Sequence, residues 1–214
     1  MNSFNGAVAQ LSEALALGGP VIAILLVMSV IALAVVLAKL WQFASMGVGR
    51  HRSIRRGLAA WDNGDVDGAH RAFGESKNHI ARVIESALGK DESVKPRYEA
   101  LAEDSLAPLE HNMRLLDLIS QIAPLLGLFG TVLGMIEAFR ALQAAGSSVD
   151  PSILAGGIWV ALLTTAAGLA VAMPVSMVLT WLESRIERER QLAASALEAA
   201  FHPITAGARY DQAA

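Results

Sequence analysis

The stretch "GLFGTVLGM" (residues 127–135) places three glycines and one threonine in a run that otherwise consists of large apolar residues. Gly127, Gly130 and Gly134 recur at spacings of three and four, so on a helix they share one face. In water glycine weakens a helix, whereas in lipid small residues let helix backbones approach closely. The stretch therefore predicts a membrane-spanning helix whose glycine face packs tightly against another helix.

The rest of the chain also indicates a membrane protein. Of its 214 residues 54% are hydrophobic and only 17% are charged, which is more apolar than an ordinary soluble domain. Three runs contain no Asp, Glu, Lys or Arg, and each has at least about the 20 residues that cross a bilayer; they are residues 14–38, 118–136 and 151–182. The first run is too long for a signal peptide, and no Lys or Arg precedes it. We therefore expect three retained spans.

The distribution of cations predicts the orientation of these spans. No cation precedes the first span, whereas five follow it closely: Lys39, Arg50, Arg52, Arg55 and Arg56. Cytoplasmic loops carry the excess of Lys and Arg, so the N-terminus is expected to be periplasmic. The predicted organisation is a periplasmic N-terminal segment (1–18), transmembrane helix 1 (19–43), a cytoplasmic helical insert (44–115), transmembrane helix 2 (116–142), a periplasmic loop (143–151), transmembrane helix 3 (152–182), and a cytoplasmic C-terminal helix and tail (183–214).

The periodicity of apolar residues predicts helices outside the membrane as well. Residues 51–61 and 69–89 read as two helices, joined by the turn "DNGDVDG". A further helix from about Pro96 is expected to run without a break into the second span. The third apolar run would be roughly 48 Å long as a helix, against roughly 30 Å of hydrocarbon. It should therefore extend into the cytoplasm and continue through residues 181–201.

Small residues also recur along the third span, where Gly157, Ala161, Thr165 and Gly168 follow at steps of four, four and three. The predicted helix-packing face therefore combines residues of both spans: Gly127, Gly130, Gly134, Gly157, Ala161 and Gly168. The hydroxyls of Thr131, Thr164 and Thr165 have two interpretations at this point. Each bonds a carbonyl of its own helix, or together they line a narrow polar path.

The carboxylate closest to these two helices on the predicted periplasmic side is Glu137. It stands three residues before Arg140, a spacing at which two side chains meet on one helix face. The first interpretation is an interfacial ion pair of little energetic value, and the second is a pair of charges at a pore entrance. The chain has no cysteine, and its five histidines are scattered without metal-ligand spacing. We therefore expect no metal site, no cofactor and no enzymatic activity.

Two longer stretches resemble a known family. "APLLGLFGTVLGMIEAF" (residues 123–139) followed by "LAGGIWVALLTTAAGLAVAMP" (residues 154–174) is similar to the MotA/TolQ/ExbB proton-channel family, closest to its ExbB and TolQ branches. The resemblance implies a multi-pass protein of the bacterial inner membrane. It implies a homopentamer, surrounded by membrane lipid, whose second and third spans enclose a dimer of a single-span ExbD- or TolR-like partner. No nucleic acid partner is implied.

In the family, proton flow through an Asp of that partner is thought to drive the motor. The resemblance thus implies a pore-forming stator subunit that passes energy to a TonB- or TolA-like protein, for outer-membrane transport or envelope maintenance. The family's pore threonines match Thr131 and Thr165, and Thr164 directly precedes Thr165. Many members carry a Glu within a G-I-x-E-A-L pattern, but this chain has Val160 there, in "GIWVAL". This departure leaves a second hypothesis, a proton-uncoupled structural scaffold of the same fold.

Overall fold

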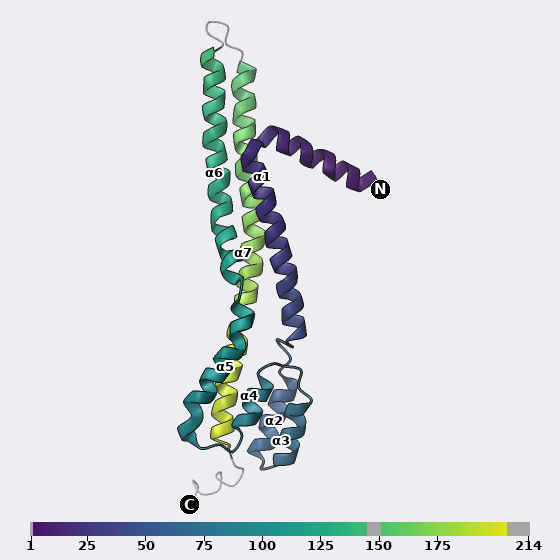
Figure 1. The fold of residues 1–214 in the computed structure, drawn as a ribbon, viewed down its shortest axis with the longest axis vertical. Coiled ribbons are helices and arrows are strands. Elements are labelled where there is room, and N and C mark those ends of the chain that lie inside the picture. The colour runs from purple at the N-terminus through teal and green to yellow at the C-terminus, as the bar shows by residue number, and fades with distance from the viewer. Residues whose placement is uncertain (1, 145–150, 205–214) are drawn as a thin grey trace, which may run out of the picture. The chain divides into compact units, whose positions relative to one another are not determined.

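A computed structural model describes residues 2–144 and 151–204. All regular structure in these two ranges is helical, which confirms the predicted all-α class. Most of the predicted periplasmic loop (143–151) and the end of the predicted tail lie outside the described residues. The elements in Figure 1 are α1 (Asn2–Ser45), α2 (Arg52–Asp62), α3 (Val66–Gly74), α4 (Ala81–Ala87), the 3-10 helix η1 (Glu92–Val94), α5 (Lys95–Glu110), α6 (Met113–Ala144) and α7 (Pro151–Phe201).

Three helices are long and apolar enough to cross a membrane, which confirms the predicted number of spans; they are Gly19–Ser45 within α1, α6, and Leu154–Phe201 within α7. The helical geometry of α1 is interrupted at Gly19, whose φ of 58° suits a residue without a Cβ. Pro20 follows, at a helix start where its missing N–H costs no hydrogen bond. α7 continues for 51 residues, which confirms the predicted extension of the third span.

The chain divides into two compact units, and α1 and α7 contribute to both. The first, here called the span unit, comprises residues 1–36 and 112–180. The second, here called the insert unit, comprises residues 37–111 and 181–214.

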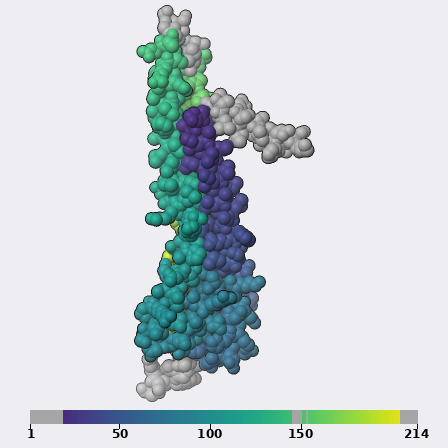
Figure 2. Space-filling model, in the orientation of Figure 1, coloured from purple at the N-terminus to yellow at the C-terminus, as the bar shows by residue number. Residues whose placement is uncertain are grey.

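The span unit is built from α6 and the first part of α7, with α1 packed against them. Its core cluster contains Val21 and Leu25 of α1, Ala123 of α6 and Ala172 of α7. α1 and α6 lie next to each other on the face shown in Figure 2. The outward positions of all three helices are large and apolar, including Val30, Leu125 and Leu162. Such surfaces suit lipid or other membrane helices.

The insert unit has a more conventional core of aliphatic and aromatic residues. α2 packs against α3, and the close approach requires a glycine, because a Cβ on Gly57 would lie 2.7 Å from the ring of Phe73. The part of α7 after residue 180 turns one apolar stripe inward. The fully buried larger side chains of this unit are Ile54, Ile80, Ile84, Leu106, Leu109, Leu182, Glu189 and Leu197.

The structure corrects the single helix predicted for residues 69–89. Two helices, α3 and α4, replace it, and the segment 75–80 between them is not α-helical. Asn78 is buried there, and its side chain accepts a hydrogen bond from the N–H of Ile80 while donating one to Glu189. The N–H of His79 donates to the carbonyl of Met46. Tertiary hydrogen bonds thus replace helical ones at this point.

The predicted continuous helix from Pro96 into the second span is also wrong. α5 ends at Glu110 and α6 begins at Met113, with Asn112 between them at a φ of 63°. Asparagine tolerates this left-handed conformation better than most residues. The carbonyls freed at the end of α5 find partners elsewhere in the insert unit. Buried Lys39 donates to the carbonyls of Pro108 and Leu109, at 3.2 and 3.0 Å.

Candidate functional site

The glycines of α6 form its contact surface with α7. Gly127, Gly130 and Gly134 are all buried, and a side chain on any of them would collide with α7. A Cβ on Gly127 would lie 2.9 Å from the carbonyl oxygen of Thr164, and a Cβ on Gly134 would lie 3.2 Å from the Cβ of Ala161. Contacts this short require the two backbones to approach closely, as small residues permit in lipid.

α7 meets this surface with small residues of its own. A Cβ on Gly157 would overlap the Cβ of Ala138, and a Cβ on Gly168 would lie 3.1 Å from the Cα of Gly127. Ala161 is 3% exposed. The structure therefore brings together all six residues of the predicted helix-packing face. They lie along one interface between α6 and α7.

Two threonine hydroxyls lie in the same interface and converge on one carbonyl. The Oγ1 of Thr164 lies 2.7 Å from the carbonyl oxygen of Ala161 in its own helix and 3.2 Å from that of Gly127 across the interface. The hydroxyl of Thr165 donates to the same Gly127 carbonyl at 3.3 Å. Thr164 is 2% exposed, whereas Thr165 is half-buried. Among the described residues of the span unit, Thr164 is the one fully buried polar side chain.

Thr131 occupies a different position. Its hydroxyl donates to the carbonyl of Leu128 in its own helix at 2.6 Å, and the residue is half-buried. The structure thus brings Thr164 and Thr165 together but leaves the Thr131 hydroxyl separate from them. A backbone connection exists, because in a regular α-helix the N–H of residue 131 donates to the carbonyl of residue 127. Thr131 and the two α7 hydroxyls would then share the acceptor Gly127.

Val160 supplies no polar atom to this region. It is half-buried and precedes Ala161, which faces α6. The apolar runs 118–136 and 151–182 contain no Asp, Glu, Lys or Arg, nor any histidine. Any proton that moves beside these helices must therefore use hydroxyls, backbone carbonyls, water or a group that another chain supplies.

Glu137 and Arg140 lie near the end of α6, and both are exposed. The ion pairs formed by the described residues do not include one between these two side chains, although their spacing permits it. Their roles, at the membrane interface or at a pore entrance, both stay predictions. Both charges remain available at the surface of the span unit.

The insert unit contains a buried carboxylate that the sequence reasoning missed. Glu189 of α7 is 1% exposed and accepts hydrogen bonds from the N–H of Gly49 at 2.5 Å and the side chain of Asn78 at 2.9 Å. The Nε2 of His51 lies 2.7 Å from the same carboxylate. The signal that could have found it is the spacing of buried α7 residues, since Glu189 stands three after Ile186.

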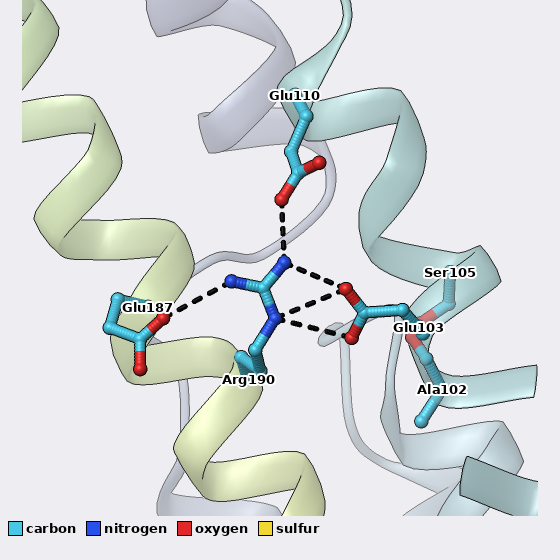
Figure 3. Close-up of polar contacts among 6 residues, drawn as sticks. All are labelled: Ala102, Glu103, Ser105, Glu110, Glu187 and Arg190. Carbon is cyan, nitrogen blue, oxygen red and sulfur yellow. Dashed lines mark hydrogen bonds and ion pairs between the residues drawn. The ribbon is translucent and has the colours of Figure 1, made fainter. Parts of the chain in front are cut away.

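Beside this buried site, an exposed ion-pair network connects α7 to α5. Arg190 bonds Glu103 at 2.7 Å, Glu110 at 2.6 Å and Glu187 at 3.1 Å, as Figure 3 shows. The hydrogen bond from Arg190 lowers the pKa of the Glu103 carboxyl below its ordinary value. Because the groups are largely exposed, water and salt screen these interactions. The network positions two helices and adds little stability.

The chemistry of these groups does not favour a bound metal. Within residues 2–144 and 151–204, His, Asp and Glu side chains do not gather in threes around a point that could hold a metal ion. The buried carboxylate already has three partners. The span unit contains a tightly packed, uncharged helix pair with hydroxyls in its interface. The insert unit contains buried polar side chains that hydrogen bonds hold in place.

Comparison with known proteins gives consistent matches. Over 62 residues the chain is 56% identical to biopolymer transport protein exbB1 of Vibrio cholerae, covering 29% of this chain and 27% of that protein. It is 34% identical to the ExbB-like 1 biopolymer transport protein of Synechocystis over 164 residues, 73% of this chain and 64% of that protein. It is 37% identical to the Tol-Pal system protein TolQ of Haemophilus influenzae over 83 residues, 39% of this chain and 36% of that protein.

The chain thus spans between about a quarter and two thirds of the length of these relatives. A family model described as the MotA/TolQ/ExbB proton channel family matches residues 74–194, which is more than half of the chain. The match includes α6, most of α7 and every residue of the helix-packing face. The chain therefore belongs to the MotA/TolQ/ExbB proton channel family.

Proposed function

We propose that the chain is an ExbB/TolQ-type, pore-forming stator subunit of a motor driven by the proton-motive force. In this role five copies surround a dimer of a single-span ExbD- or TolR-like partner in the bacterial inner membrane. The N-terminus is periplasmic, and residues 44–115 and 183–214 are cytoplasmic. The motor delivers its work to a TonB- or TolA-like protein. Family membership and the three apolar helices support this architecture.

The observation that carries the proposal is the convergence of the Thr164 and Thr165 hydroxyls on the Gly127 carbonyl. These hydroxyls place hydrogen-bonding atoms in an otherwise apolar helix pair without burying a charge, which is expensive in lipid. Thr131 adds a third hydroxyl one helical turn beyond Gly127. In our proposal these groups form one wall of the proton path, and the titrating carboxylate belongs to the partner. Glu137 and Arg140 lie at its periplasmic entrance.

Proton flux into proteoliposomes that contain the chain and its single-span partner tests the role of the hydroxyls. Thr165→Val and Thr131→Val remove a hydroxyl while nearly keeping the side-chain volume, and each should lower the flux roughly tenfold or more with assembly intact. Thr180→Val is the matched control, because this α7 hydroxyl donates within its own helix to Ser176 and lies outside the packing face. Unchanged flux in both test variants would contradict the proposed path.

Val160 favours a second candidate function, the proton-uncoupled scaffold. In that case the chain assembles around its partner but conducts no protons, because its span carries no carboxylate. Val160→Glu distinguishes the two, since the position is only half-buried. A stator should tolerate the change or gain flux, whereas a scaffold should show no flux before or after it. Loss of the oligomer would instead show that residue 160 packs against a neighbouring subunit.

A further inference from the structure

A hollow of about 320 Å³ on the insert unit combines an apolar wall with two arginines. The residues that line it include Leu40, Phe43 and Ala44 of α1, Arg50 of the following loop, and Trp181 and Arg185 of α7. We propose that this hollow binds the headgroup and the first acyl carbons of an anionic phospholipid. The proposal rests on a membrane location for the apolar helices and does not depend on proton flow.

The position of the hollow along the two helices matches the edge of a hydrocarbon layer. The uncharged run of α1 ends at residue 38 and the helix itself ends at Ser45, while the uncharged run of α7 ends at Leu182. Arg50 follows the end of α1 by five residues, and Arg185 follows Leu182 by three. Lipid phosphates lie at the level where apolar helix surface gives way to cations, and tryptophan is enriched at the same level. Leu40 and Trp181 are 41% and 45% exposed there.

The two arginines are oriented and lack an internal counter-charge. The guanidinium carbon of Arg185 lies 5.2 Å from the centre of the Trp181 ring, a cation–π contact that leaves its N–H groups free for another partner. A Cβ on Gly49 would lie 3.5 Å from its Nη1, so the guanidinium passes over this glycine. Within the described ranges neither Arg50 nor Arg185 forms an ion pair with a carboxylate. Guanidinium groups bind phosphate in a bidentate manner.

The neighbouring surface strengthens the preference for a negative ligand. A hollow of about 470 Å³ is lined by His51, Arg52 and Arg55 among others, and one of about 430 Å³ by His51, Arg55 and Arg188. None of the three hollows has an Asp or Glu in its lining. The nearby carboxylate of Glu189 is buried and already bonded to Gly49, His51 and Asn78. The local field is therefore positive and attracts anionic over zwitterionic lipid.

The apolar wall identifies a lipid as the occupant. A small phosphate would gain nothing from the exposed parts of Leu40 and Trp181, whereas an acyl chain buries apolar area against them at about 25 cal/mol per Å². The alternative is that the arginines act only through the general excess of cytoplasmic cations that orients the protein, which requires no apolar wall and no particular pair of arginines. The two explanations predict different results when these specific arginines are removed.

Native mass spectrometry of the full chain in neutral detergent tests the site, with phosphatidylglycerol or phosphatidylcholine of matched chains added. The wild type should retain phosphatidylglycerol in preference, and Arg50→Gln with Arg185→Gln should reduce that preference roughly fivefold. Arg82→Gln with Arg97→Gln is the control, since it removes the same charge from exposed insert-unit positions. Equal losses in the two double variants, or no preference in the wild type, would overturn the proposal.

Two further arms complete the experiment. Inorganic phosphate at about 10 mM should not displace the bound lipid; displacement would assign the hollow to a small anion instead. A phosphatidylglycerol with a photoreactive group close to the glycerol should crosslink wild-type protein at residues 40–50 and 181–185. Crosslinks elsewhere at the same depth, without these segments, would overturn the proposal even if the arginine variant does not fold. No proton gradient is present, so failure here leaves the proposed stator function standing.

Discussion

The span unit and the insert unit differ in how they bury polar groups. Among the described residues of the span unit the buried side chains are apolar except for the Thr164 hydroxyl, whereas the insert unit buries Lys39, Asn78 and Glu189. In the span unit, α6 and α7 are in contact through closely spaced backbones and small residues. In the insert unit each buried polar side chain has hydrogen-bond partners from distant parts of the sequence. The difference suggests that the first unit excludes charge from a membrane helix pair while the second fixes loops and helices rigidly.

The comparison predicts the largest stability loss at the buried carboxylate. Glu189→Ala leaves the Gly49 N–H, the Asn78 amide and His51 without their shared partner. Breaking a buried charged interaction costs roughly 3–5 kcal/mol. The midpoint of thermal unfolding, followed by circular dichroism in detergent, should fall sharply. Glu183→Ala, an exposed position on the same helix, is the control; equal midpoints for the two variants would show that Glu189 does not brace the insert unit.

The next largest effect concerns the helix-packing face. Gly157→Val places a side chain where even a Cβ would overlap Ala138, while Gly156→Val adds the same side chain where nothing lies within 4 Å. Overpacking costs roughly 1–3 kcal/mol, and both variants share the same change in helix propensity. Gly157→Val should therefore lower the yield of assembled oligomer on a sizing column, and Gly156→Val should not. A reversed order would place the interface on another face.

A smaller, pH-dependent effect is expected at His79. Its burial lowers the pKa below the ordinary 6.5, although the Met46 carbonyl and the charge of Glu189 oppose the shift. Because the folded state takes up the proton less readily, its stability is full above the unfolded pKa and declines as the pH falls below it. Wild-type protein should thus lose thermal stability between about pH 7.5 and about pH 5.5. His79→Leu should lose less over the same interval; an equal or greater loss assigns the effect to other groups.

The smallest effect is expected from the exposed network around Arg190. Glu103→Gln removes a partner whose pKa this arginine lowers, so its contribution is present above the ordinary carboxyl pKa of 4.5 and disappears as the pH falls. Exposed pairs contribute at most about 1 kcal/mol. The unfolding midpoint should change slightly, and less at high salt. Asp104→Asn, exposed on the same helix, is the control; a large, salt-independent change would mean that the network is effectively buried.

Parts of the candidate site were accessible from the sequence because they depend on local periodicity. The six small residues were predicted by their spacing, and they lie in one interface between α6 and α7. The threonine partners were not accessible in the same way. Two interpretations of the hydroxyls were open, and the contact of Thr165 with Gly127, 38 residues apart in the sequence, depends on how α6 and α7 pack. The sequence predicts which face of each helix packs, but the register between two packed helices is known only from the tertiary structure.

The helical class, the three apolar helices and the long extension of α7 could all be predicted before the structure was known, because span length and apolar periodicity are properties of contiguous residues. The positions of the helix breaks in the insert unit depend instead on contacts between distant residues. The interruption at Asn78 accompanies its bond to Glu189, 111 residues away, and the end of α5 is satisfied by Lys39, 70 residues from Leu109. The position of such a break depends on which donors from distant parts of the sequence reach the free carbonyls. Local helix propensity contains no information on these long-range contacts.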